Sequence, residues 1–138
     1  GLDGPRQPNV PCITSFQVSL ARGKVDLQTN WRSNDVGLGL PNDVYGNYFF
    51  MSTISQRFQL PLGTYVHSIA NAHIYDPHLS QLTELLEIQS DHPPIKLDLP
   101  PRSLERCMQG DYTLVDEIVE GIKPQYKPQK KIKLELFK

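Results

Sequence analysis

The sequence lacks three features that would point to common classes of protein. Its two cysteines, Cys12 and Cys107, exclude the dense disulfide framework of a small secreted scaffold and the paired spacing of a zinc site. No apolar run approaches the roughly 18 residues that a membrane-spanning helix needs. A net charge of −1 gives no reason to expect nucleic acid or an anionic membrane as a partner. We therefore expect a cytoplasmic protein without a bound metal.

The strands are predicted from residue alternation. Prolines and glycines crowd residues 1–11, which we expect to form a loop. A turn at Arg22 and Gly23 joins the first two predicted strands into a hairpin. Period-two alternation or enrichment in β-forming residues predicts strands over residues 13–20, 24–30, 64–75, 95–99 and 131–137.

The helices are predicted from apolar residues at three- and four-residue steps. This spacing predicts a buried face on a long helix over about residues 43–59, with Asn42 or Asp43 as its N-cap. Its apolar members are Val44, Tyr48, Met51, Ile54 and Phe58. Shorter helices are predicted from Pro77 onward and over residues 103–109 and 114–119. The fold class is therefore mixed α/β, of the α+β kind, with one curved sheet packed against helices.

Several side chains could carry chemistry, and each has an ordinary alternative. Cys12 follows Pro11 at the start of a strand, where a lone cysteine is most often a small buried hydrophobe. Arg32 and Ser33 place a guanidinium beside a hydroxyl, which suits a phosphate but also a solvated hairpin end. His73 and Tyr75 alternate on one strand and so face the same side, as a core pair also does.

The order and spacing of these groups are more informative than any one of them. Pro11-Cys12, the stretch from Arg32-Ser33-Asn34-Asp35 to Pro41, and Ala72-His73-Ile74-Tyr75 together resemble the thymidylate synthase family. Members of that family are about twice as long as this chain. The resemblance implies that residues 1–138 form the C-terminal half of a thymidylate-synthase-like domain. Residues 1–11 would be its entry loop, and 12–138 its nucleotide-binding and sheet portion.

The resemblance also implies roles for the matching residues. Cys12 corresponds to the thiolate that adds to C6 of a pyrimidine, and an arginine nearby favours the thiolate form. The substrate is then a pyrimidine nucleoside monophosphate, and the second substrate is 5,10-methylenetetrahydrofolate. The implied nucleotide contacts are Arg32 and Ser33 to the 5′-phosphate, Asp35 to the base through its backbone, and His73 and Tyr75 to the 3′-hydroxyl.

Asp43 departs from the family pattern, which usually has asparagine at this position. A carboxylate accepts a hydrogen bond from the C4 amino group of cytosine, and a proton shared with N3 completes the pair. Asp43 thus resembles the cytidylate hydroxymethylase branch, and we assign it a catalytic as well as a substrate-binding role.

Three functions remain open from the sequence. The first is hydroxymethylation of dCMP or CMP by a homodimeric, folate-dependent transferase. The second is methylation of dUMP by a thymidylate synthase. The third is a non-catalytic nucleotide-binding or dimerisation fragment. We expect the intact protein to be an enzyme and the isolated chain to be inactive.

Overall fold

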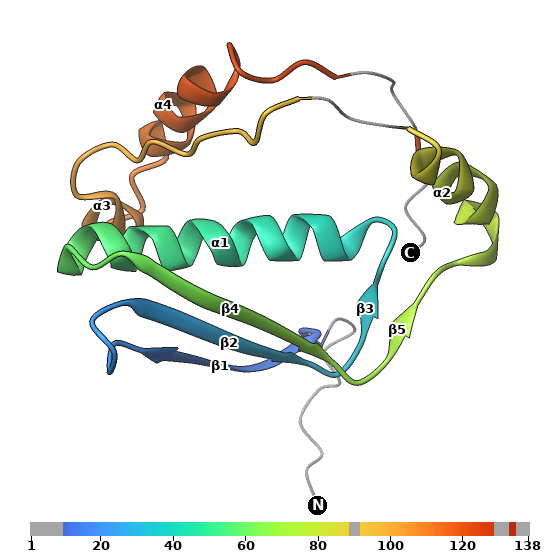
Figure 1. The fold of residues 1–138 in the computed structure, drawn as a ribbon, viewed down its shortest axis with the longest axis horizontal. Helices are drawn as coiled ribbons and strands as arrows, with labels where there is room; N and C mark the ends of the chain where they lie inside the picture. The colour runs from blue at the N-terminus through green and yellow to red at the C-terminus, as the bar shows by residue number, and fades with distance from the viewer. Residues whose placement is uncertain (1–9, 89–91, 129–132, 135–138) are drawn as a thin grey trace, which may run out of the picture.

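The structure is a computed structural model that describes residues 10–88, 92–128 and 133–134. Its elements follow the chain in a mixed α/β order (Figure 1). They are β1 (Ile13–Ser19), β2 (Val25–Trp31), β3 (Asn34–Asp35), α1 (Gly39–Phe58), β4 (Leu62–Ile69), β5 (Ala72–His73), the 3-10 helix η1 (Asp76–His78), α2 (Leu79–Leu86), α3 (Ser103–Met108) and α4 (Thr113–Ile122).

The main sheet has three strands with β2 in the centre. β1 pairs with it antiparallel and β4 pairs with it parallel. The hairpin between β1 and β2 turns at Gly23, whose φ of 67° lies in the left-handed region that glycine adopts without strain. The two predicted hairpin strands are therefore confirmed.

Helix α1 covers one face of this sheet, and α3 and α4 lie on the same side (Figure 1). Alternate β2 residues Val25 and Leu27 point to α1, where they pack against Met51 and Ile54 in the core. The predicted helical face was only partly right. Its remaining members are Val44, which is half-buried, and Tyr48 and Phe58, which are exposed.

The prediction of one strand over residues 64–75 is wrong, because that segment breaks at Ala70 and Asn71. β5 leaves the main sheet and pairs in parallel with β3, and together they form a second sheet of two strands. The neighbouring strand β2 also ends at this level, and the backbone N–H of Ala70 donates to the Trp31 carbonyl at 2.9 Å. The segments that follow β2 and β4 therefore turn together at this level.

Two further strand predictions are not supported. Residues 95–99 form no strand, because the side chain of Gln125 satisfies both the N–H of Lys96, at 2.9 Å, and its carbonyl, at 3.0 Å. Prolines on both sides also restrict pairing there. Of the predicted strand 131–137, only Lys133 and Leu134 are described and neither is in a strand; the rest lies outside the described residues.

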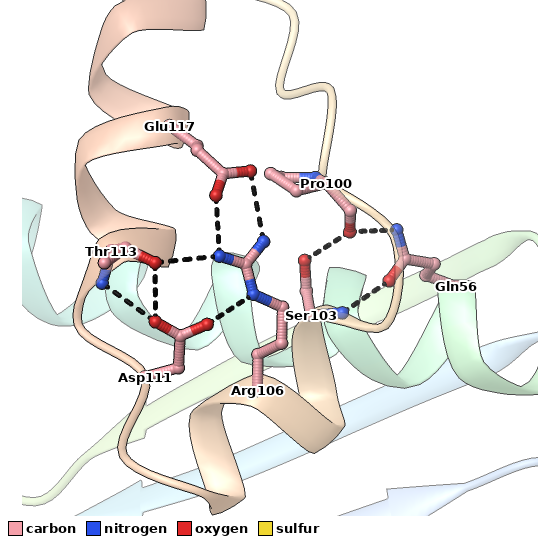
Figure 2. Close-up of polar contacts among 7 residues, drawn as sticks. All are labelled: Gln56, Pro100, Ser103, Arg106, Asp111, Thr113 and Glu117. Carbon is pink, nitrogen blue, oxygen red and sulfur yellow. Dashed lines mark hydrogen bonds and ion pairs between the residues drawn. The ribbon is translucent and has the colours of Figure 1, made fainter.

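The short helices α3 and α4 confirm the two helical predictions near the end of the chain. Figure 2 shows how they are joined to α1 and to each other. The amide of Gln56 on α1 donates to the Pro100 carbonyl at 2.9 Å and accepts from the Ser103 N–H at 3.0 Å. Arg106 of α3 pairs with Glu117 of α4 at 2.6 Å. Within the described part of the chain, no helix is both long and apolar enough to cross a membrane.

Candidate functional site

Cys12 lies at the start of β1, beside the end of β2. Its side chain is a free, exposed thiol, and its carbonyl accepts the Arg32 N–H at 2.9 Å. The Arg32 guanidinium folds back over the same loop and donates to the carbonyls of Val10, at 2.9 Å, and Pro11, at 3.2 Å. The sheet pairing thus places a fixed positive charge beside the two residues that precede the thiol.

Ser33 and His73 meet across the small sheet of β3 and β5. Ser33 Oγ lies 3.3 Å from His73 Nδ1, and the amide of Asn71 donates to the same hydroxyl at 3.4 Å. Asp35 is the register partner of His73, and its carboxylate accepts the Gly37 N–H at 3.0 Å. The second sheet therefore brings hydroxyl, imidazole and amide groups together from segments about 40 residues apart.

Tyr75 lies two residues after the end of β5, beside two histidine rings. Its ring meets that of His73 edge to face, with centroids 5.2 Å apart, and that of His78 at 6.0 Å. Because Tyr75 remains partly exposed, its hydroxyl and the His73 ring can present donors and acceptors to a ligand on the same side.

The sequence analysis predicted Asn42 or Asp43 as the N-cap of α1, but Asp43 does not cap the helix. The helix begins four residues earlier, with Leu38 at the N-cap, so Asp43 lies in its second turn. The Asp43 carboxylate instead accepts a hydrogen bond of 2.9 Å from Asn34 Nδ2. Asn42 is not the cap either, since its amide donates to the Leu38 carbonyl at 2.8 Å.

Two residues that the sequence analysis did not select complete this part of the site. Asn34 is 3% exposed, and its amide nitrogen also lies 3.5 Å from His67 Nε2. His67 is held by the Tyr65 hydroxyl at Nδ1 and by the Trp31 ring, which stacks on it at 5.1 Å. The available signal was the period of β4, which places Tyr65 and His67 on the side of the sheet that faces α1.

Burial and charge act in opposite directions on the His67 ring. Partial burial lowers the pKa of His67, and the nearby negative charge of Asp43 opposes that shift without cancelling it. The imidazole is therefore neutral at physiological pH, with one ring nitrogen available as an acceptor.

The expected site residues thus fall into three adjoining groups. Cys12 is joined to Arg32, Ser33 to His73 and Tyr75, and Asn34 to Asp43, with residues 32–35 linking all three. A hollow of about 460 Å³ lies beside Arg32. It is lined by Thr14, Asn30, Trp31, Arg32, Ser68, Ile69 and Ala70, a set that does not include Asp43 or His73. The described residues contain no His, Cys, Asp and Glu group placed to hold a metal ion.

Two comparisons with known proteins bear on the family and the fold of this chain. Thermostable thymidylate synthase A from Bacillus subtilis is similar to this chain, with 31% sequence identity and a TM-score of 0.57. The match covers 61% of this chain and 30% of that chain, so it spans less than a third of that relative. The mixed α/β structure accordingly matches part of a thymidylate-synthase-like fold. The family model described as thymidylate synthase matches residues 6–137. The chain therefore belongs to the thymidylate synthase family.

Proposed function

We propose that the protein carrying this chain transfers a one-carbon unit to C5 of a pyrimidine nucleoside monophosphate, and that its substrate is a cytidylate. The observation that carries the transferase assignment is the exposed Cys12 thiol beside Arg32, in a chain of this family. An exposed thiol near a guanidinium is the setting in which cysteine acts as a nucleophile.

In this proposal the nucleotide spans the three groups. Arg32 and Ser33 bind the 5′-phosphate, since a guanidinium and a hydroxyl both donate to phosphate oxygens. His73 and Tyr75 bind the 3′-hydroxyl of the sugar, and the Asp35 backbone contacts the base. Support comes from residues 32–35, whose continuous backbone runs past Cys12, His73 and Asp43 in turn.

Cys12 would begin the reaction. Its thiolate forms a bond to C6, and the electron pair of the C5–C6 double bond moves to C5. C5 then bonds to the methylene carbon that 5,10-methylenetetrahydrofolate supplies as the second substrate. The C5 proton leaves, and the bond between that carbon and the folate nitrogen breaks, so that tetrahydrofolate departs with the electron pair and an exocyclic methylene remains on C5. Water adds to the resulting exocyclic methylene, and elimination of the thiolate restores the aromatic ring. The product is a 5-hydroxymethyl cytidylate.

Asp43 is the residue that favours cytosine in this proposal. An ionised carboxylate only accepts hydrogen bonds, which suits the C4 amino group of cytosine and not the O4 of uracil. The structure removes the main alternative role, because Asp43 is not the helix cap. Methylation of dUMP is the second candidate, favoured by the likeness to a thymidylate synthase.

Calorimetric titration of the intact protein tests this proposal. Cytidylate and uridylate, in ribo and deoxy forms, are titrated against wild type and Asp43→Asn. We expect wild type to prefer cytidylate by up to about 10⁴-fold, because a buried polar group is left unpaired on the wrong base. Asp43→Asn should shift the preference towards uridylate. Equal affinities in wild type would overturn the cytidylate assignment and leave dUMP methylation as the better function.

A two-fold homodimer that packs sheet against sheet is the proposed assembly. Among the described residues, the helices α1, α3 and α4 lie on one side of the main sheet and leave its opposite face for a partner (Figure 1). That face carries Gln17, Gln28, Thr64 and Val66. Sedimentation of the intact protein at a monomeric mass would rule this assembly out.

A further inference from the structure

The side-chain amide of Asn34 connects two groups on different elements. Its Nδ2 lies 2.9 Å from Asp43 Oδ2 on α1 and 3.5 Å from His67 Nε2 on β4. An amide nitrogen carries two hydrogens and only donates, and an ionised carboxylate only accepts. One hydrogen therefore goes to Asp43, and the other points towards Nε2 of His67 over a longer contact.

Donor and acceptor rules fix the direction of the chain of contacts behind Asn34. If His67 Nε2 accepts from Asn34, a neutral ring carries its proton on Nδ1 and donates it to the Tyr65 hydroxyl. The Tyr65 hydroxyl then donates to Thr29 Oγ1 at 3.2 Å. Thr29 Oγ1 also accepts from the Trp31 indole N–H, which can only donate, at 3.0 Å.

The opposite direction creates a conflict at Asn34. A proton on His67 Nε2 would face the Asn34 amide nitrogen, which is also a donor. Rotating the amide would remove that clash but would set its oxygen against the Asp43 carboxylate, which would bring two acceptors together. Because Asn34 is almost fully buried, neither mismatch can be relieved by water at its surface.

We propose that Asn34 is a positioning residue for base selection, held in place by a neutral, Nδ1-protonated His67. The Asn34 amide donates to Oδ2 of Asp43 and so fixes the orientation of this carboxylate in the second turn of α1. In that orientation the carboxylate presents a hydrogen-bond acceptor to the base. This inference rests on the proposed function, because it assumes that Asp43 meets the base. It adds that Asp43 discriminates against uracil O4 only while Asn34 holds it.

Asn34→Ala in the intact protein tests this role. The variant frees the Asp43 carboxylate to rotate out of the orientation that meets the C4 amino group of cytosine. The ratio of the affinity for cytidylate to that for uridylate should therefore fall about tenfold. This factor corresponds to the free energy that a hydrogen bond to a charged group usually contributes. If the role of Asn34 were purely structural, the variant would bind both nucleotides more weakly by the same factor, and the ratio would be unchanged. In an Asp43→Asn background, Asn34→Ala should change the ratio no further.

Asn47 offers a matched control on the same helix. Its amide donates to the backbone carbonyl of Asp43 at 2.7 Å, so Asn47→Ala removes a similar bond to the same residue without touching the carboxylate. That variant should retain the wild-type ratio. His67→Phe, which keeps a ring against Trp31 but removes Nε2, should lower the ratio in the same direction as Asn34→Ala.

The outcomes separate this inference from the proposed function. Wild type without a cytosine preference overturns the proposed function, and the base-selecting role of Asn34 with it. A cytosine preference that Asn34→Ala leaves intact overturns the inference alone. Nitrogen NMR of the ligand-free protein tests the geometry even if Asn34→Ala fails to fold: we expect His67 to be protonated on Nδ1, and an Nε2-protonated ring overturns the inference.

Discussion

Asp26 Oδ1 accepts the backbone N–H of Thr64 at 2.7 Å, so a carboxylate of β2 holds the beginning of β4. Its other oxygen accepts from Arg22 at 2.9 Å. The hydrogen bond from Thr64 is the largest of the effects that lower the pKa of Asp26, and the hydrogen bond from Arg22 is the next. Gly63 makes this geometry accessible, because an added Cβ would lie 2.9 Å from the Val25 carbonyl oxygen and closer still to Asp26 Oδ1.

Gly63→Ala should therefore destabilise the protein. The new methyl group meets backbone on one side and a bonded carboxylate on the other, and overpacking of this kind costs about 1–3 kcal/mol. Urea unfolding measures the change. Gly46→Ala is the matched control, because Gly46 lies inside α1 with no atom within 4 Å of an added Cβ. It should stabilise the protein by about 0.5–1 kcal/mol. Equal effects of the two changes would contradict this account.

Arg106 joins α3 to α4 and is the centre of the cluster in Figure 2. Its guanidinium contacts Asp111 at 2.7 Å, Thr113 at 3.1 Å and Glu117 at 2.6 Å. Arg106→Leu should loosen α4, although the buried side chain of Leu114 still packs at the start of that helix. We expect faster amide hydrogen exchange in residues 113–122 and little change in the main sheet.

The acid response of the same cluster follows from its carboxylates. Hydrogen bonds from Thr113 and Arg106 lower the pKa of Asp111, and Arg106 lowers that of Glu117. Their stabilising effect is therefore present above the ordinary values of 3.8 and 4.5 and is lost as pH falls through the lower folded values. The protection of α4 amides against exchange should therefore fall below about pH 4 in wild type, and should fall less in Arg106→Leu, where only the Thr113 bond to Asp111 remains.

Lys123→Ala is the control for Arg106→Leu. Lys123 pairs with Glu120 on the same helix at 3.1 Å, and both side chains are about 70% exposed. Surface pairs of this kind contribute little to stability. Exchange in α4 should therefore be unchanged in Lys123→Ala. An effect as large as that of Arg106→Leu would mean that any lost cation loosens the helix.

The sequence was sufficient for elements whose signal is local. The hairpin follows from alternation on both sides of Gly23, and α1 follows from helical spacing with an error of four residues at its start. The break after Ile69 was not predictable in the same way. Ala70, Asn71 and Ala72 have low β-propensity, but β-forming residues return at Ile74 and Tyr75, so the prediction ran the strand through the interruption. The end of the partner strand β2 at the same level fixes where the chain turns, and that position is set by the pairing.

The candidate site shows the same division. Its chemical groups were predicted from a resemblance to a family, and the family match confirms the family. The contact of Asn34 with His67 was not predicted, because the two are 33 residues apart. It depends on the parallel register that sets Thr29 beside His67, and on the turn that brings Asn34 back over the end of the sheet.

His67→Phe should make the protein less sensitive to acid. Because burial lowers the pKa of His67, the stability that its neutral ring contributes is present above its ordinary value of 6.5 and is lost as pH falls through the lower folded value. Phenylalanine keeps a ring against Trp31 but cannot take up a proton. As the pH is lowered from 7.5 to 5, the Tm of the variant should therefore rise relative to that of wild type. His92→Gln, at an exposed position, should give no such trend.

Nucleotide should protect Cys12, but not Cys107, from alkylation. Both thiols are free and exposed, so both should react with iodoacetamide in the ligand-free intact protein. Cys12 lies beside Arg32, where the phosphate is proposed to bind, whereas Cys107 lies on α3. At a cytidylate concentration of about 100 Kd, modification of Cys12 should slow roughly a hundredfold, because only the unliganded fraction reacts. Mass spectrometry of the peptides follows the two rates separately, and inorganic phosphate alone should protect Cys12 less. Equal protection of both thiols would indicate that nucleotide stabilises the whole fold. If nucleotide does not protect Cys12, this residue does not belong to the nucleotide site.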